Sequence, residues 1–474
     1  MAKNNAVTDF NPVPAVITLL TGMILWFIPA PEGISADAWH LLAIFIATIV
    51  GIITKPLPMG VVAVFGITAT VLTGILSIGQ ALSGFGNSTI WLIVTAFFVS
   101  RGFIKTGLGA RIAWFFIALF GKRTLGLAYG IISADLVLAP AIPSNTARSG
   151  GVLFPLLKSI AEAYGSNPEK GTSRRIGAFL IKTSFQGTVI TSAMFMTAMA
   201  ANPLAVKLAG DMGVEITWMS WASAAFLPGI VSLLAVPWII YKLYPPEIKE
   251  TPGAVKLAKE KLSEKGAVSR HEILMLITFI LLLSLWIFGR HLGIHSTTAA
   301  LTGLCVLLIT GVLTWEDILS EKDAWNTLVW FAALVMMAAQ LNELGFISWF
   351  SDTIGRSVAG VGWIKAFTVL SLVYFYSHYF FASNTAHVSS MYAPFLAVAI
   401  AAGTPPVLAA LVLAFFSNLF SSMTHYGTGP APVLFGSGYV DMPTWWKLGG
   451  IISIVNIIIW LGIGGIWWKT LSLW

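Results

Sequence analysis

Two Ser-Asn-Thr runs combine side chains that suit the binding of a small anion. They are Ser144-Asn145-Thr146 and Ser383-Asn384-Thr385, and each interrupts an otherwise apolar segment. Their hydroxyl and amide groups are neutral hydrogen-bond donors, which fit a carboxylate. If each run also opens a helix, the free N–H groups and the positive end of the helix dipole strengthen this preference. A single copy would indicate little, because Ser and Asn cap ordinary helices.

The two runs belong to a repeat that spans most of the chain. They lie 239 residues apart, and the same interval separates Asn87 from Asn326. Further along, Pro203 and Pro430 lie 227 residues apart, each shortly after a Met-Thr pair. Polar breaks at corresponding places in two halves are the expected mark of a transporter's binding site. The repeat therefore favours one paired site over two unrelated helix caps.

A second pair of breaks extends the candidate site. Asn202-Pro203 and Thr428-Gly429-Pro430 interrupt apolar segments where proline and glycine disfavour a continuous helix. The residues predicted to bind substrate are Ser144, Asn145, Thr146, Asn202, Pro203, Ser383, Asn384, Thr385, His425, Thr428, Gly429 and Pro430. Two tips would hold two carboxylates of one molecule. The pattern therefore favours a dicarboxylate, or a citrate-like tricarboxylate, over a monocarboxylate.

The composition of the chain indicates a membrane protein. Of its 474 residues, 57% are hydrophobic and 10% are charged, whereas a soluble domain carries about 25% charged residues. Too few polar side chains remain to cover a surface in water, so the surface must face lipid. The single Cys305 excludes an internal disulfide and a cysteine metal cluster, and we expect neither a metal nor a cofactor. The basic residues bracket apolar segments and form no single patch, which argues against nucleic acid as a partner.

Interrupted apolar segments predict where the chain turns inside the membrane. Segment 127–163 contains two prolines and paired glycines beside the first Ser-Asn-Thr run, and segment 362–401 contains the second run. Such a sequence ends a helix. Irregular backbone at membrane depth is tolerated only where protein or a watery cavity surrounds it. We therefore expect two re-entrant hairpins whose tips meet at one cavity.

The predicted fold class is an all-α polytopic membrane protein built as an inverted repeat. Its parts are a first transmembrane helix within 1–37, a first repeat at 38–244, a basic cytoplasmic loop at 245–270 and a second repeat at 271–474. Loops rich in Lys and Arg stay on the cytoplasmic side of a membrane. We expect the N-terminus in the cytoplasm and the C-terminus outside, with the protein in the cell's inner (cytoplasmic) membrane.

A short amphipathic segment precedes the first hairpin. Residues 101–111 carry basic side chains at roughly helical spacing among apolar ones. We expect an interfacial helix there, with a counterpart at 343–357 on the opposite face of the membrane.

The paired tips, each followed by a break that contains proline, resemble the divalent anion:sodium symporter (DASS) family over nearly the whole chain. The runs 144–155 and 424–432 are most similar to its branch of 2-oxoglutarate/malate translocators and citrate/succinate or tartrate/succinate antiporters. This resemblance implies a homodimer with about eleven transmembrane helices, two hairpins, a scaffold domain and an elevator-type transport domain. It also implies that the tips bind carboxylates of 2-oxoglutarate, malate or succinate, with citrate and tartrate as further candidates.

Basic residues near the tips bear on how the substrate's charge is balanced. A desolvated dianion needs a counter-charge, which a symporter takes from Na⁺ and an exchanger can take from fixed cations. Arg148, Lys182 and His387 lie near the tips or on segments leading to them, although each could instead snorkel or pack as a structural residue. Sodium-coupled DASS members usually carry Thr-Pro-Pro runs after the tips, and at its two breaks this chain instead has Ala201-Asn202-Pro203 and Thr428-Gly429-Pro430. We therefore expect antiport without sodium, with a sodium-coupled di- or tricarboxylate symporter as the alternative.

Two other classes of membrane protein fit the sequence less well. An intramembrane enzyme would need a nucleophile with a base, or metal ligands, and the chain has neither His-Glu-x-x-His nor Gly-x-Ser-x-Gly. An ion channel usually has a repeated pore motif with a carbonyl or charge-ring filter. The inverted half-sites favour a carrier over both.

Overall fold

The computed structural model describes residues 10–350, 353 and 362–474, and every regular element within them is helical. Six stretches are long and apolar enough to cross a membrane: α2 (Ala36–Thr54), α5 (Ser88–Thr106), α11 (Trp218–Leu243), α13 (Arg270–Leu292), α16 (Lys322–Glu343), and α23 (Met442–Ile458) continued by η7 (Ile459–Ile463) and α24 (Gly464–Thr470). The shorter apolar helices are α1 (Pro12–Phe27), α3 (Met59–Leu72), α6 (Leu108–Phe120), α7 (Thr124–Leu138), α14 (Ser296–Ile309), and α21 (Pro406–Leu419) with η6 (Phe420–Ser422). The predicted all-α polytopic membrane fold is confirmed.

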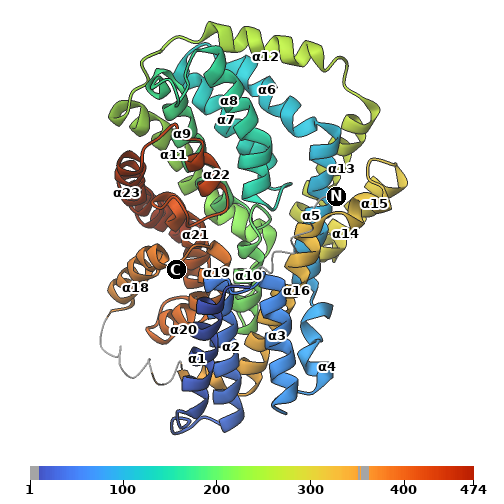
Figure 1. Cartoon of the computed structure of the whole chain (residues 1–474), viewed down its shortest axis with the longest axis vertical. Coiled ribbons are helices and arrows are strands. Elements are labelled where there is room, and N and C mark those ends of the chain that lie inside the picture. The colour runs from blue at the N-terminus through green and yellow to red at the C-terminus, as the bar shows by residue number, and fades with distance from the viewer. Residues whose placement is uncertain (1–9, 351–352, 354–361) are drawn as a thin grey trace, which may run out of the picture.

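The helices form two groups that meet along two short helices. In the first group, α2 packs against α1 and α3, while α16 packs against α3 and α5, and α14 against α5 and α13. In the second group, α9 (Gly177–Met194) packs against α7, α11 and α21. Figure 1 shows α5, α14 and α16 on one side and α9, α11 and α23 on the other. Between them, α10 (Ala201–Asp211) contacts α5 and α16, and α19 (Asn384–His387) contacts α2.

A polar helix lies across one end of the molecule (Figure 1). This helix, α12 (Pro252–Glu264), falls within the segment 245–270 that was expected to be a basic loop, and it packs against α6. A hydrogen bond from Thr251 N–H to Lys122 O, at 2.8 Å, ties its start to the turn before α7. The remaining short elements are α4 (Ile78–Ala81), η1 (Ser83–Gly86), η3 (Ser173–Arg175) and α15 (Trp315–Leu319).

Each Ser-Asn-Thr run lies at the turn of a helical hairpin. The first hairpin runs through α7, turns over residues 139–144 and returns through residues 145–146, which are helical, η2 (Ala147–Leu153) and α8 (Phe154–Ala163). The second comprises α18 (Trp363–Ser377), η4 (His378–Phe380), α19, η5 (Val388–Tyr392) and α20 (Ala393–Ala401). In both hairpins a π-helical turn follows the Ser-Asn-Thr run. The helices bracket the segments 127–163 and 362–401 that the sequence singles out as hairpins.

In each of the two breaks, a tryptophan donates a hydrogen bond to the threonine of the Met-Thr pair. The first break separates α9 from α10, and the second separates η6 from α22 (Pro430–Gly436). Trp218 Nε1 donates to Thr197 Oγ1 at 3.2 Å, and Trp445 Nε1 donates to Thr424 O at 3.2 Å. The two tryptophans lie 227 residues apart, as do the two threonines. The repeat seen in the sequence therefore extends to tertiary contacts.

The expected interfacial helix at 101–111 is not a separate element. α5 continues through Thr106, and Gly107 ends it in the left-handed region at φ 75°. A new helix, α6, then runs over Leu108–Phe120. The glycine at position 107 allows this sharp change of direction, which the spacing of charges did not predict. Of the expected counterpart at 343–357, residues 346–350 are helical, and residues 351–352 and 354–357 lie outside the described residues.

Close packing between η1 and α16 gives a test of the fold. Gly84 lies so near α16 that a Cβ atom would overlap the carbonyl oxygen of Ala332. We expect Gly84→Ala to destabilise the protein by about 1–3 kcal/mol, because backbone must move to relieve the overlap. Gly79→Ala is the matched control, since nothing lies within 4 Å of a Cβ there. Equal melting temperatures of the two purified variants would contradict this packing.

Candidate anion-binding site

Both Ser-Asn-Thr tips and the second break line one cavity of about 370 Å³. The hairpins and breaks contribute Pro143, Ser144, Asn145, Thr146, Met199, Ala200, Ala382, Ser383, Asn384, Thr385, Ala386, Thr428 and Gly429. The opposite wall comes from the first helix group and consists of Ile52, Ile53, Lys55, Met59, Phe97, Asp323, Asn326, Thr327 and Trp330. The cavity therefore lies between the two helix groups.

In the first tip, the serine caps a helix and the asparagine joins the tip to the second break. Ser144 Oγ accepts a hydrogen bond from Ala147 N–H at 3.1 Å. Asn145 Nδ2 donates to Thr428 Oγ1 at 2.9 Å. The first N–H groups after a helix cap have no acceptor within the helix. The Ala147 N–H is bonded to Ser144 Oγ, which leaves the N–H groups of Asn145 and Thr146 and the half-buried hydroxyls of Ser144 and Thr146 as donors for a ligand.

The second tip repeats the pattern with different partners. Ser383 Oγ accepts from Ala386 N–H at 3.5 Å. Asn384 Nδ2 donates to Ser417 O at 2.9 Å and to Ser421 Oγ at 2.8 Å. Both asparagine amides thus donate to the protein and fix the tips. The half-buried serine and threonine of each tip supply the donors that face the cavity.

Two glycines in the second break allow the hairpins to approach it. A Cβ at Gly429 would overlap Thr146 Oγ1 of the first tip. A Cβ at Gly427 would lie 2.7 Å from His378 Nε2 of the second hairpin. The second break therefore contacts both hairpins directly, and glycine at these positions makes that possible.

Three of the predicted site residues lie behind the cavity wall. Asn202 is buried, and its Nδ2 donates to Ser192 O at 2.8 Å and to Phe195 O at 3.0 Å. Its Oδ1 accepts from Asn418 Nδ2 at 2.7 Å. Pro203 and Pro430 are buried in the first turns of α10 and α22. These residues shape the breaks, and the structure does not bring them to the cavity surface.

Arg148 is buried beside the first tip and is fully bonded to protein. Its Nε donates to Asp135 Oδ1 at 2.6 Å. One terminal nitrogen donates to Ile142 O and to Ala198 O, both at 3.0 Å, and so joins the first tip to the first break. The guanidinium therefore does not line the cavity, and Asp135 already balances its charge.

His387 lies in a buried aromatic cluster behind the second tip. Its Nδ1 lies 3.2 Å from Nδ1 of His378, whose Nε2 lies 2.9 Å from Gly427 O. The His387 ring is 4.6 Å from the ring of Tyr374 between centroids. The two histidines thus connect the second hairpin to the second break.

The two halves use different chemistry at equivalent positions. The interval of 239 residues that relates the tips also relates Arg148 to His387 and Asp135 to Tyr374. An ion pair in the first half therefore corresponds to an aromatic contact in the second. In both halves the residue that follows the tip belongs to a network that reaches the neighbouring break.

His425 and Lys182 lie away from the cavity. His425 Nδ1 accepts from Trp446 Nε1 at 3.1 Å, and its ring packs 4.7 Å from the ring of Phe435. Lys182 is fully buried, where its Nζ donates to Trp445 O at 3.0 Å and lies 4.0 Å from the centre of a Trp445 ring. Neither side chain lines the space between the tips.

None of the residues in the opposite wall was predicted from the sequence to belong to the site, and two of them are charged. Lys55 ends α2, and Asp323 lies in the first turn of α16. Asn326 had been noticed only as a repeat anchor, because it matches Asn87 at the common interval. One feature of the sequence could have identified Lys55 as a candidate: it is a basic residue placed between an apolar segment and a proline. In the described residues, no group of three or more His, Cys, Asp or Glu could hold a metal ion.

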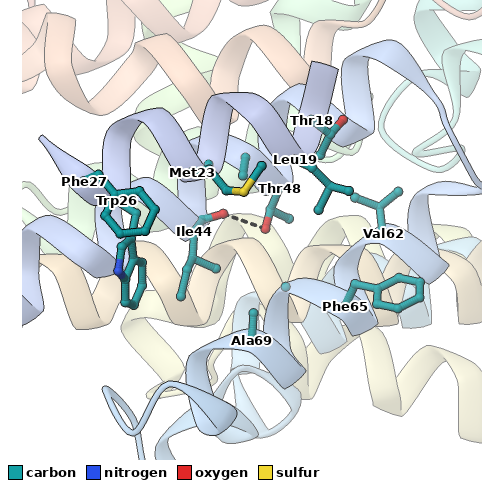
Figure 2. A pocket seen from close by; sticks show the side chains of 13 residues that line it. Thr18, Leu19, Met23, Trp26, Phe27, Ile44, Thr48, Val62, Phe65 and Ala69 are labelled. Carbon is teal, nitrogen blue, oxygen red and sulfur yellow. Dashed lines mark hydrogen bonds between the residues drawn. The ribbon is translucent and has the colours of Figure 1, made fainter. Parts of the chain in front are cut away.

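Another cavity, of about 400 Å³, lies between α1, α2 and α3 and has a different character. Figure 2 shows that its lining is apolar apart from Thr18, Thr48 and the Trp26 indole. Thr48 Oγ1 donates to Ile44 O at 2.8 Å, and Thr18 Oγ1 donates to Pro14 O at 2.9 Å. Both hydroxyls are bonded within their own helices. This cavity therefore suits apolar groups and not an anion.

Comparison with known proteins relates this geometry to a family. The profile of the family described as "Sodium:sulfate symporter transmembrane region" matches residues 11–474. A putative malate transporter, YflS, of Bacillus subtilis (strain 168) is 63% identical over 463 residues, covering 98% of this chain and 97% of the relative. Dicarboxylate transporter 1, chloroplastic, of Spinacia oleracea is 56% identical over 464 residues, covering 97% and 82%.

A solved structure supports the fold. The crystal structure of the Alcanivorax borkumensis YdaH transporter matches 97% of this chain and 96% of its own chain. The TM-score is 0.59 and the sequence identity is 11%. Sequence identity this low supports a shared fold and nothing about substrate.

The buried ion pair behind the first tip gives a second prediction. We expect Asp135→Ala to destabilise the protein by about 3–5 kcal/mol, because it leaves the buried Arg148 guanidinium without a counter-charge. Asp37→Ala is the control, since Asp37 is exposed in the first turn of α2. The measurement is the melting temperature of each purified protein in detergent.

A double variant separates two causes of lost stability, an unpaired buried charge and poorer packing around the first tip. Asp135→Leu combined with Arg148→Met removes both charges and should recover the part of the lost stability that comes from the unpaired charge. The double variant should stay less stable than the wild type, because the buried Ile142 and Ala198 carbonyls lose their donor. If Asp135→Ala melted at the same temperature as Asp37→Ala, the ion pair would not hold the first tip.

Proposed function

Because this chain belongs to the sodium:sulfate symporter family, we propose that it exchanges C4 and C5 dicarboxylates by antiport across the cytoplasmic membrane. Family membership confirms the resemblance to DASS transporters and makes the chain a membrane transporter, not an enzyme. The observation that carries the proposal is the meeting of two Ser-Asn-Thr tips at one cavity.

The geometry of the tips supports a substrate with two carboxylates. Each tip presents a half-buried serine and threonine beside the first turn of a helix. Such a turn offers N–H donors and a positive partial charge. The relatives described above are named as malate and dicarboxylate transporters. We infer that malate, succinate and 2-oxoglutarate are the substrates, with citrate and tartrate as weaker candidates.

The bonding of carbonyl groups near the tips supports exchange without sodium. Carriers often hold Na⁺ with carbonyl oxygens of unwound backbone. Here the Arg148 guanidinium donates to Ile142 O and Ala198 O, where the first tip meets the first break. In the second half, His378 Nε2 bonds to Gly427 O. These carbonyls are already bonded to protein donors, which favours antiport over the alternative, a sodium-coupled symporter.

The two helix groups support an elevator-type movement. We infer that the second group, which carries the tips, moves as the transport domain against the first group as scaffold. The cavity lies between the groups, so such a movement would carry substrate from one face of the membrane to the other. We also propose that the protein is a homodimer, with α12 and the N-terminus on the cytoplasmic side and the C-terminus outside.

Liposomes that contain the purified protein and unlabelled malate test the coupling. We expect rapid uptake of labelled succinate without any sodium, because the tips must be reoccupied for the carrier to return. Liposomes without internal malate should take up little. Uptake that requires a sodium gradient and does not depend on internal malate would contradict antiport and support the sodium-coupled symporter.

Variants of the tips test the location of the site. Ser144→Ala and Asn384→Ala should each reduce succinate exchange by about tenfold or more, since each removes a hydrogen-bonding group from a tip. Ser320→Ala is the control, because Ser320 is exposed and lies outside the cavity. Membrane insertion should be unaffected in all three. Normal exchange by both tip variants would place the substrate elsewhere.

A further inference from the structure

The tip cavity contains one charge of each sign, and both come from the wall opposite the tips. Among the described residues that line it, Lys55 is the one cation and Asp323 the one anion. Both side chains are exposed. Neither takes part in any of the ion pairs found within 4 Å among the described residues. Their charges are therefore available to a molecule in the cavity.

The backbone at Lys55 is unusual for a lysine. Lys55 ends α2 in the left-handed region, with φ 53° and ψ 56°, and its N–H donates to Gly51 O at 2.9 Å. Ser472 is the one other described non-glycine residue with a positive φ. Side chains with a Cβ rarely adopt this conformation, and such outliers cluster at functional sites. A glycine or asparagine would fit the turn with less strain, so the lysine side chain must bring another benefit.

Lys55 also lies where two cavities adjoin. A neighbouring cavity of about 380 Å³ is lined by Lys55, Leu57, Pro58, Met59 and Asn326. Lys55, Met59 and Asn326 line the tip cavity as well. Lys55 therefore borders both cavities. A positive charge at such a junction attracts anions and raises their local concentration.

We propose that Lys55 and Asp323 select the substrate by its charge, so that dianions are favoured over trianions. This inference rests on the proposed function. With one carboxylate at each tip, Lys55 can bind one of them from the opposite wall. A third carboxylate would share the cavity with Asp323 and find no further cation there.

Kinetics of exchange test the role of Lys55. Lys55→Asn removes the charge and keeps a residue that tolerates a positive φ. We expect its KM for malate to rise about tenfold or more, as for a lost charge-assisted hydrogen bond, with a nearly unchanged maximal rate. Lys55→Arg should keep a KM near that of the wild type. Lys322→Gln is the control, since Lys322 is exposed in the same helix turn as Asp323 and does not line the cavity.

Substrate preference tests the role of Asp323. In Asp323→Asn, the rate of citrate exchange relative to malate should rise about tenfold, because a like charge no longer opposes the third carboxylate. Glu316→Gln, an exposed carboxylate outside the cavity, should leave that ratio unchanged. An unchanged ratio in Asp323→Asn, or a wild-type KM in Lys55→Asn, would overturn the proposal.

Calorimetric titration of the same detergent-purified proteins with malate separates this inference from the proposed function. Wild-type protein that binds malate yet shows no exchange would contradict antiport and leave the binding comparison intact. Lys55→Asn protein that is monodisperse and binds malate as tightly as the wild type would contradict the charge selection alone. Weaker binding by Lys55→Asn, recovered in Lys55→Arg, would support it.

Discussion

The structure depends on providing hydrogen-bond partners for the backbone N–H and C=O groups at points where helices end inside the membrane. No water in the lipid interior can bond an exposed N–H or C=O group, so irregular backbone must find partners in protein or in a watery cavity. The chain meets this constraint with long side chains that reach from one interruption to another. Arg148 bonds carbonyls of both the first tip and the first break, and His378 bonds Gly427 O in the second break. The donors at the tips that have no partner within the protein face the cavity. The helix interruptions therefore also form a candidate anion site.

The two halves of the chain provide these partners with different residues. In the first half, a buried ion pair between Asp135 and Arg148 lies behind the tip. At the equivalent positions of the second half, Tyr374 and His387 form an aromatic contact. Buried charge is tolerated only when it is paired and hydrogen-bonded, and Arg148 meets that condition through five groups of the protein. The first half therefore carries an ion pair where the second carries aromatic rings, and in both halves the network occupies backbone carbonyls of the neighbouring break.

The sequence predicted the interruptions well, and the contacts between them poorly. Short polar runs in apolar segments are local signals, and their repetition at one interval located both tips and both breaks. Side-chain partners depend on tertiary packing, which sequence spacing does not report. His425 was therefore expected in the site, although it packs against Trp446. Lys55 was overlooked because it belongs to another helix group, far from the tips in sequence and close to them only across the cavity.

The most direct test of the central claim is a structure determined by electron cryomicroscopy with saturating malate, in lipid nanodiscs. We expect density for malate between the two tips. One carboxylate should lie within hydrogen-bond distance of the Ser144 and Thr146 hydroxyls, and the other should lie near Ser383 and Thr385. Malate bound at another place, with the space between the tips empty, would contradict the account.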